Sequence, residues 1–284
     1  MSLIDLSGKV ALVTGGSRGI GAATAVVLAR AGAEVAITYR TRVGAAEQVL
    51  DRIRGCTHHP VPAPDGIAHA RSPIAIRADV SLREECEQMV RRVVEAFGKL
   101  DIFVANAGIW PPEQVGVAEM SDEQWKTTVA VNLDSVFFGC RAALQAMLRE
   151  RGAVGNPAIM QPSAGGSIVI VSSTASQRGE AFHADYAASK GAVNAFVKSL
   201  GVEAAPYGIN VNAVAPGWVD TEMCDIPFER EQGVGKREIE AGIPLGRVAS
   251  PEDIAGPIVF LCSHLARHIA GEVLNVNGGA VLCG

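Results

Sequence analysis

The sequence of 284 residues predicts an α/β fold, a doubly wound parallel β-sheet of about seven strands with helices on both faces. Short β-branched runs alternate along the chain with helical patterns. The runs are apolar on both faces, as in strands buried within a parallel sheet. Parallel neighbours need crossover helices, which are right-handed. Because no boundary interrupts the series, we expect one domain over residues 1–284.

The individual elements follow in chain order. The first strand, KVALVT, precedes a glycine-rich turn and a helix of small residues that ends at Gly32, a typical helix terminator. The later strands and helices repeat this alternation. The predicted strands are 9–14, 34–39, 74–78, 101–105, 167–172, 209–214 and 272–276. The predicted helices are 20–31, 43–54, 82–97, 122–150, 184–204 and 251–264.

Two stretches rich in proline and glycine, 55–73 and 152–166, interrupt this alternation. Both are predicted to be surface loop insertions, because such residues break helices and strands. The first contains His58, His59 and His69, but no neighbouring residue completes a ligand set. We therefore expect no metal site.

The composition excludes several classes of protein. Lysine plus arginine total 25 against 30 acidic residues, giving a net charge of −5, and the chain has no basic run of the kind that binds nucleic acid. No apolar run is long enough to span a membrane, and the N-terminus lacks the pattern of a signal peptide. The six scattered cysteines fit free thiols in a reducing compartment, so we expect a cytoplasmic protein.

A glycine-rich loop, TGGSRGIG (14–21), joins the first strand to the first helix. Its glycines, Gly15, Gly19 and Gly21, would let the backbone approach a pyrophosphate at the N–H groups of the helix terminus. The spacing differs from the commonest dinucleotide fingerprint, G-x-G-x-x-G. A tight turn without a ligand is the alternative, but the flanking strand and helix favour a cofactor loop.

The end of the second predicted strand indicates which cofactor is preferred. An acidic residue there would bind the ribose hydroxyls of NAD, but the chain instead has Tyr39, Arg40 and Arg42. Arg18 of the glycine loop can reach the same region. Guanidinium groups suit a phosphate, so we expect NADP(H) to be preferred, with NAD(H) as the alternative.

Residues 186–190 read YAASK. Four residues span one helical turn, so Tyr186 and Lys190 lie on one face of the predicted helix 184–204. An ordinary helix surface would explain the pair equally well by itself.

The chain resembles the short-chain dehydrogenase/reductase family from residue 8 to about 280. The motifs occur in the family's order: TGGSRGIG (14–21), DV (79–80), NAG (106–108), VNL (131–133), SS (172–173), YAASK (186–190) and PGWVDT (216–221). The resemblance implies a Rossmann-like sheet in the order 3-2-1-4-5-6-7 and a reaction that moves hydride between a nicotinamide and a carbonyl or secondary alcohol. Residues 247–280 look most like 3-oxoacyl-[acyl-carrier-protein] reductases, although sugar, polyol and steroid dehydrogenases share this pattern.

The resemblance assigns catalytic roles to four residues. Tyr186 would exchange the hydroxyl proton, and Lys190 would lower the pKa of the phenol, because a nearby cation favours the phenolate. Lys190 would also bind the nicotinamide ribose. Of two adjacent serines the family spacing selects Ser173 over Ser172 to hold the substrate oxygen. Asn132 would anchor a water chain to Lys190, with a structural amide in a helix kink as the alternative.

The same resemblance implies a set of cofactor contacts distributed along the chain. They comprise the phosphate loop, the adenine site, the cleft after the fourth strand and the turn beside the nicotinamide, in addition to Tyr186 and Lys190. The residues are Gly15, Ser17, Arg18, Gly19, Ile20, Gly21, Arg40, Asp79, Val80, Asn106, Ala107, Gly108, Pro216, Gly217, Val219 and Thr221.

The remaining expectations concern the substrate and the partners. Residues 218–245 would form a mobile lid, and Trp110, Trp218 and Phe182 would line the pocket or simply pack. The substrate is a small-molecule or acyl-thioester carbonyl compound, with sugars, polyols and other secondary alcohols as the alternative. A regulatory protein that binds cofactor without catalysis is a third hypothesis, disfavoured by the intact catalytic set.

An acyl carrier protein would need basic residues at the cleft mouth, and the sequence offers a few for that role. They are Arg141, Arg149, Arg151 and Lys236. We expect no nucleic-acid or membrane partner. We expect a homotetramer, or a dimer, in line with the family.

Overall fold

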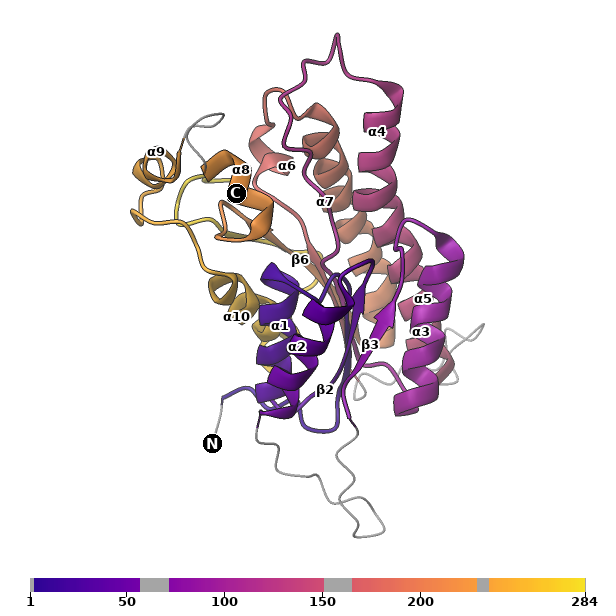
Figure 1. Cartoon of the computed structure of the whole chain (residues 1–284). Helices are drawn as coiled ribbons and strands as arrows, with labels where there is room; N and C mark the ends of the chain where they lie inside the picture. Colours follow the sequence, from indigo (N-terminus) through magenta and orange to yellow (C-terminus); the bar gives the residue numbers. More distant parts are fainter. Residues whose placement is uncertain (1–2, 57–71, 151–164, 229–234, 284) are drawn as a thin grey trace, which may run out of the picture.

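The computed structural model describes residues 3–56, 72–150, 165–228 and 235–283. Its centre is a seven-stranded parallel sheet in the order β3-β2-β1-β4-β5-β6-β7 (Figure 1). The strands are β1 (Val10–Val13), β2 (Glu34–Tyr39), β3 (Ile74–Arg77), β4 (Ile102–Ala105), β5 (Gly166–Val171), β6 (Ile209–Pro216) and β7 (Val273–Val276). The predicted fold class and strand order are confirmed.

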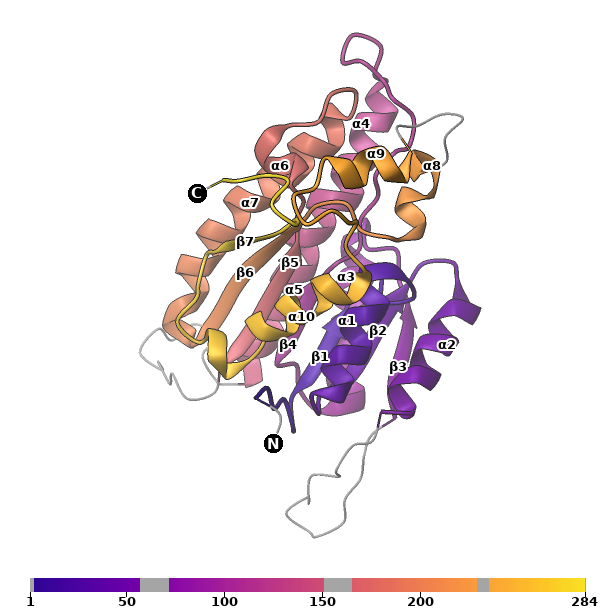
Figure 2. The same ribbon diagram turned by 90° about the vertical axis from the view of Figure 1, so that its left-hand side faces the viewer.

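Helices cover both faces of the sheet. Figure 2 shows α1 (Gly19–Arg30), α2 (Val43–Arg54) and α10 (Pro251–Leu261) in front of the sheet. On the other face lie α3 (Arg83–Phe97), α5 (Ser135–Glu150) and α7 (Ala184–Ala204) (Figure 1). This arrangement is the reason for the doubly apolar strands: in β1, Leu12 belongs to one core cluster and Ala11 and Val13 belong to the other.

The predicted helix 122–150 is not uniform. It comprises α4 (Asp122–Val129), a π-helical turn at Ala130–Asp134 and then α5. A π-turn inserts an extra residue and is often found at functional sites. Asn132 lies within this turn and is fully buried. Residue periodicity alone did not predict the interruption.

The two predicted insertions fall mostly outside the described residues, which omit 57–71 and 151–164. The last residue of the second predicted insertion (152–166) is the first residue of β5, which begins at Gly166. The described part of the predicted lid contains three short helices. They are a 3-10 helix at Glu222–Cys224, α8 (Asp225–Phe228) and α9 (Lys236–Ala241).

The carboxyl ends of the strands meet at one edge of the sheet. At β1 the order of the strands changes direction, because β2 lies on one side of it and β4 on the other. Leu12 of β1 is paired with Ala36 of β2 and with Phe103 of β4. A crevice at such a switch point is where ligands bind in open α/β sheets. Among the helices in the described part of the chain, none has both the length and the apolar character to cross a membrane.

Candidate active site

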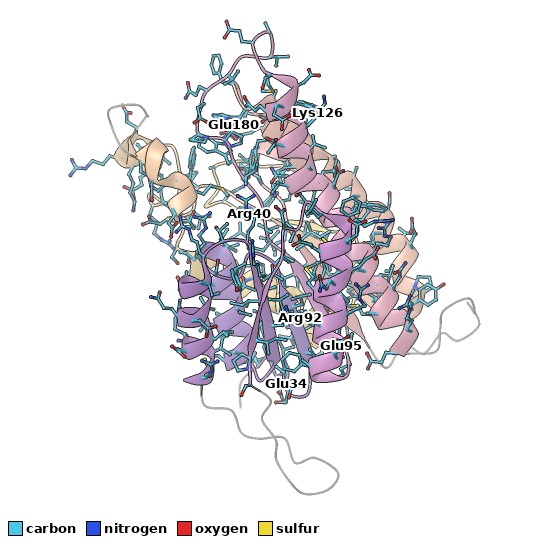
Figure 3. The ribbon with its side chains drawn as sticks, turned by 45° about the vertical axis from the view of Figure 1, so that its right-hand side comes forward. Glu34, Arg40, Arg92, Glu95, Lys126 and Glu180 are labelled. Carbon is cyan, nitrogen blue, oxygen red and sulfur yellow. The ribbon has the colours of Figure 1, made fainter. Side chains whose placement is uncertain are left out.

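A cavity of about 310 Å³ opens at the carboxyl ends of the strands. Figure 3 marks this end of the sheet with Arg40, which follows β2, whereas Glu34 at the start of β2 lies at the opposite end. Most predicted cofactor residues line the cavity, together with Tyr186 and Lys190. They are Gly15, Ser17, Arg18, Gly19, Ile20, Arg40, Asp79, Val80, Asn106, Ala107, Gly108, Pro216, Gly217, Val219 and Thr221.

The glycine loop forms a tight backbone cradle. Gly15 and Gly19 have φ angles of 62° and 52°, in the left-handed region that side chains disfavour. A Cβ atom at Gly21 would lie 2.4 Å from the carbonyl oxygen of Gly15 and 2.5 Å from Nδ2 of Asn106. Gly21 does not line the cavity itself; its lack of a side chain lets α1 approach the loop.

The N-terminus of α1 fits a phosphate. It has no side-chain cap and no acidic residue in its first turn, so its N–H groups remain available to an anion. Asn106 fixes the loop from β4, because its Nδ2 donates to the carbonyl of Thr14 at 2.9 Å. The residues present therefore suit the pyrophosphate of a dinucleotide.

Three arginines stand at the end of β2 and in the glycine loop. Arg18, Arg40 and Arg42 all line the cavity. Glu222 of the lid contacts two of them, with its Oε2 atom 2.7 Å from Arg18 Nη1 and 2.5 Å from Arg42 Nη1. Glu222 directly follows the PGWVDT motif but was not among the residues predicted from the sequence.

The adenine-side residue Asp79 is held by its own loop. Its Oδ1 accepts hydrogen bonds from the backbone N–H of Ser81 at 3.0 Å and from the Ser81 hydroxyl at 2.7 Å. Val80 beside it is buried. Together they form one wall of the cavity next to the end of β3.

Asn132 joins two elements of the site through its side chain. Its Oδ1 accepts from the N–H of Ile109 at 2.8 Å, while Nδ2 donates to the carbonyl of Ile109 at 2.9 Å and to Ser189 Oγ at 3.2 Å. The amide thus ties the loop after β4 to α7. This is the structural role considered as the alternative for Asn132, and the role in a water chain stays a prediction.

Gly108 allows the polar groups to approach each other. A Cβ atom there would lie 3.1 Å from Oδ1 of Asn132 and 3.5 Å from Nζ of Lys190. Both side chains are buried. A larger residue at position 108 would therefore press against both groups.

Lys190 is a buried ammonium with one clear acceptor. Its Nζ donates to the carbonyl of Val171 at 2.8 Å. Burial lowers the pKa of Lys190 to about 8, because the charged form loses its hydration. At neutral pH the side chain is therefore still mostly protonated.

Tyr186 differs from the sequence-based expectation. Burial raises the pKa of Tyr186 to about 12, a hydrogen bond with Ser173 acts against this rise, and the charge of Glu180 adds to it. Lys190 Nζ lies 5.9 Å from the centroid of the tyrosine ring. The lowering of the phenol pKa expected from Lys190 is therefore outweighed, because the cost of removing a phenolate from water dominates.

The two adjacent serines are clearly distinguished by their partners. Ser173 shares a hydrogen bond with the Tyr186 hydroxyl. Ser172 instead contacts Asn194 Oδ1 at 2.6 Å and the carbonyl of Lys190 at 3.4 Å, which ties β5 to α7. Ser172 is a lining residue of the cavity and Ser173 is not, although Ser173 is the one bonded to Tyr186, so the choice of Ser173 as the site serine stays a prediction.

Aromatic residues form one wall of the cavity. The rings of Trp110 and His183 have centroids 4.3 Å apart, Trp218 lies 6.4 Å from Trp110, and Phe228 lies 6.1 Å from Trp218. Trp110 and Trp218 line the cavity. Phe182, the third predicted wall residue, is 54% exposed and is not a lining residue.

Several other lining residues were not predicted from the sequence, and Glu180 and Cys224 are among them. Burial raises the pKa of the Glu180 carboxyl, while the charges of His183 and Arg178 and a hydrogen bond from the Trp110 side chain act in the opposite direction. Neither residue belongs to a motif that the sequence analysis used. Within the described residues, no three His, Cys, Asp or Glu side chains gather as a metal site.

Known proteins are similar to this chain over nearly its whole length. Residues 15–281 match the family model described as Enoyl-(Acyl carrier protein) reductase. An L-rhamnose 1-dehydrogenase (NAD(P)(+)) of Sphingomonas sp. (strain SKA58) is 36% identical over 96% of both chains. A 3-oxoacyl-[acyl-carrier-protein] reductase of Synechocystis sp. is 34% identical over 98% of both chains.

A solved structure is similar over nearly the whole chain. It is a short chain dehydrogenase from Burkholderia cenocepacia J2315 in complex with NADP, with a TM-score of 0.79 and 33% identity. The similarity covers 97% of this chain and 98% of the other.

Proposed function

The chain belongs to the short-chain dehydrogenase/reductase family, and on this premise we propose that it moves hydride between NADP(H) and a carbonyl or secondary alcohol carbon. The nicotinamide supplies or accepts the hydride when it is bound. The protein must then position the substrate oxygen and exchange its proton.

Tyr186 is the proposed acid–base group. It donates its proton to the developing alkoxide in reduction and removes the hydroxyl proton in oxidation. Ser173, hydrogen bonded to Tyr186, holds the same substrate oxygen. Lys190 places a positive charge near the phenol and binds the ribose, and Asn132 anchors the water chain that resupplies protons to Lys190.

The cofactor is held by groups at the carboxyl ends of β1 to β4. The free N–H groups of α1 and the glycine loop bind the pyrophosphate. Arg18, Arg40 and Arg42 bind the 2′-phosphate, since the end of β2 carries no carboxylate of its own. The NADP complex of the Burkholderia relative supports this preference.

The observation that carries the proposal is the hydrogen bond between the half-buried Ser173 and Tyr186, with Lys190 near the tyrosine ring. A regulatory protein without catalysis would not require this arrangement. The test is Tyr186→Phe, which removes the transferable proton and keeps the ring. We expect kcat for carbonyl reduction to fall by about 10² to 10⁴-fold while the Tm is kept; undiminished reduction would contradict the mechanism.

Cofactor preference has its own measurement. Initial rates with NADPH and NADH at equal concentration should favour NADPH. Faster turnover with NADH would refute the assignment of the three arginines to the 2′-phosphate without affecting the role of Tyr186.

Two substrate classes remain for the proposal. Reduction of a 3-oxoacyl thioester is supported by the Synechocystis relative, and oxidation of a sugar or other secondary alcohol is supported by the Sphingomonas relative. The basic residues considered for a carrier protein are partly engaged elsewhere: Arg141 lies 3.7 Å from Glu87 and 4.8 Å from the Phe137 ring, and Lys236 lies 2.6 Å from Asp220. This weakens the case for a carrier partner.

We further propose that the chain is one domain that assembles as a homotetramer, or a dimer, in the cytoplasm. The measurement is light scattering of the purified protein. A monomer at micromolar concentration would contradict the assembly.

A further inference from the structure

One corner of the cavity is unusual in its chemistry. Glu180 lines it beside Tyr186, and the two groups are near enough for the charge of Glu180 to act on the phenol. The carboxyl is partly desolvated, the charges of His183 and of Arg178, another lining residue, act on it, and the side chain of Trp110 donates a hydrogen bond to it. A carboxyl group in a mostly aromatic wall is costly unless its oxygens find donors.

The backbone holds this carboxyl in place. Between Glu180 and His183 lies Phe182, with a φ angle of 65°, the one non-glycine residue with positive φ in the described chain. The loop is fixed by bonds from Val115 N–H to the Phe182 carbonyl at 3.0 Å and from His183 N–H to the Glu180 carbonyl at 3.2 Å. Strained backbone of this kind is retained where it positions a functional group.

The aromatic wall is equally specific. His183 is 3% exposed and stacks on Trp110, which fixes the indole that donates to Glu180. Trp218 stands edge-on to Trp110 at 6.4 Å. The corner thus presents indole rings for C–H surfaces and a carboxyl group with acceptor capacity left after one hydrogen bond.

We propose that Glu180 and Trp110 form a subsite for the hydroxyl groups of a polyhydroxylated substrate, a sugar or polyol, next to the reacting carbon at Tyr186. This inference rests on the proposed hydride transfer and selects one of its two substrate classes. Hydroxyl groups satisfy the carboxylate oxygens, and a ring C–H face packs on the indole.

An acyl chain fits this corner poorly. Methylene groups donate no hydrogen bond to Glu180, so an acyl substrate would remove water from the carboxyl group and supply no new donor beside Trp110. A site built to bond a substrate hydroxyl discriminates strongly against analogues that lack it. Glu180 is therefore the residue that favours the polyhydroxylated class.

The test measures kcat/KM for a defined panel. Aldohexoses, 6-deoxyhexoses and alditols are oxidised with NADP+ and with NAD+, and acetoacetyl thioester and 2,3-butanedione are reduced with NADPH and with NADH. The wild-type protein should prefer at least one polyhydroxylated compound over the thioester; the aldoses and alditols separate a sugar from a polyol. Glu180→Gln, which keeps the shape, should lower kcat/KM for that compound about 10 to 100-fold.

Glu203→Gln provides the matched control. Glu203 is an exposed residue of α7 away from the cavity lining, so this variant should match the wild-type protein. If Glu180→Gln does not fold, Trp110→Phe removes the indole N–H and keeps an aromatic ring, and it should reduce the same kcat/KM.

The outcomes separate the two proposals. A higher kcat/KM for the thioester than for any polyhydroxylated compound overturns the subsite and leaves the proposed function standing. The same conclusion follows if Glu180→Gln has the wild-type kcat/KM for the polyhydroxylated compound. Absence of hydride transfer with every compound, including 2,3-butanedione, overturns both.

Discussion

The cofactor half and the catalytic half of the cavity are built differently. In the cofactor half, backbone N–H groups and glycines form the cradle, and the charged side chains Arg18, Arg42 and Glu222 are about half exposed. In the catalytic half, Asn132 and Lys190 are buried and hydrogen bonded to elements distant in the sequence. Binding a phosphate therefore depends on local backbone shape, whereas proton transfer depends on tertiary packing.

The largest expected effect is a difference in kcat between variants of two neighbouring serines of the catalytic half. Ser173→Ala should lower kcat by about 10² to 10³-fold with little change in Tm, because it removes the hydroxyl that bonds Tyr186. Ser172→Ala should keep most of kcat and lose roughly 1–2 kcal/mol of stability, since it removes the hydroxyl that donates to Oδ1 of the half-buried Asn194 at 2.6 Å. Equal kcat losses in the two variants would remove the distinction.

The second prediction concerns the buried charge of Lys190. Its pKa is about 8 in the folded protein, below the ordinary 10.5, so the unfolded chain binds more protons between these values. Stability from this group is therefore lowest below pH 8 and rises as pH increases from about 8 to 10.5, by an amount of the order of 3 kcal/mol.

The measurement compares wild type with Lys190→Met by denaturant unfolding at several pH values. The difference isolates Lys190 from the other titrating groups, among them the buried Cys86, whose pKa is raised to about 12. The wild-type protein should gain stability relative to the variant across this interval. A constant or falling difference would show that the ammonium is not desolvated.

The third prediction tests the backbone cradle of the cofactor half. Gly21→Ala places a methyl group against the Gly15 carbonyl and should cost about 1–3 kcal/mol of stability as well as NADPH affinity. Gly256→Ala is the control, because that helical glycine of α10 is exposed with no atom within 4 Å of the added group. The control should be neutral or stabilising by up to about 1 kcal/mol; similar losses in both would argue against the cradle.

The smallest expected effect lies at the exposed Glu222. Its carboxylate occupies Arg18 and Arg42, which are proposed to bind the 2′-phosphate, so Glu222→Gln should lower the KM for NADPH about 2 to 5-fold. The KM for NADH should change less. Because exposed ion pairs are screened, the difference should shrink at high salt. A raised KM for NADPH would mean that Glu222 supports the arginines instead of competing with the phosphate.

Local patterns predicted the fold class and the phosphate loop of the cofactor half, and the family resemblance supplied the other cofactor contacts. The alternation of doubly apolar strands with helices predicted the parallel sheet, because burial on both faces imposes this pattern on each strand separately. The glycines and Arg18 lie within one loop of the sequence, as the turn and the helix N-terminus require, and Arg40 and Arg42 follow the next strand. The order of the strands came from the family resemblance, and the structure confirmed it.

Only the tertiary structure decided the properties of the catalytic half. Four of these properties depend on segments distant in the sequence. They are the π-turn at Asn132, the burial that raises the Tyr186 pKa to about 12, the separate partners of Ser172 and Ser173, and the placement of Glu180 beside Trp110. Desolvation and hydrogen bonding depend on what surrounds a group in space. The sequence by itself therefore determined which residue types stand at the site, and the packing of α7 against β6, α6 and the π-turn decided their chemistry.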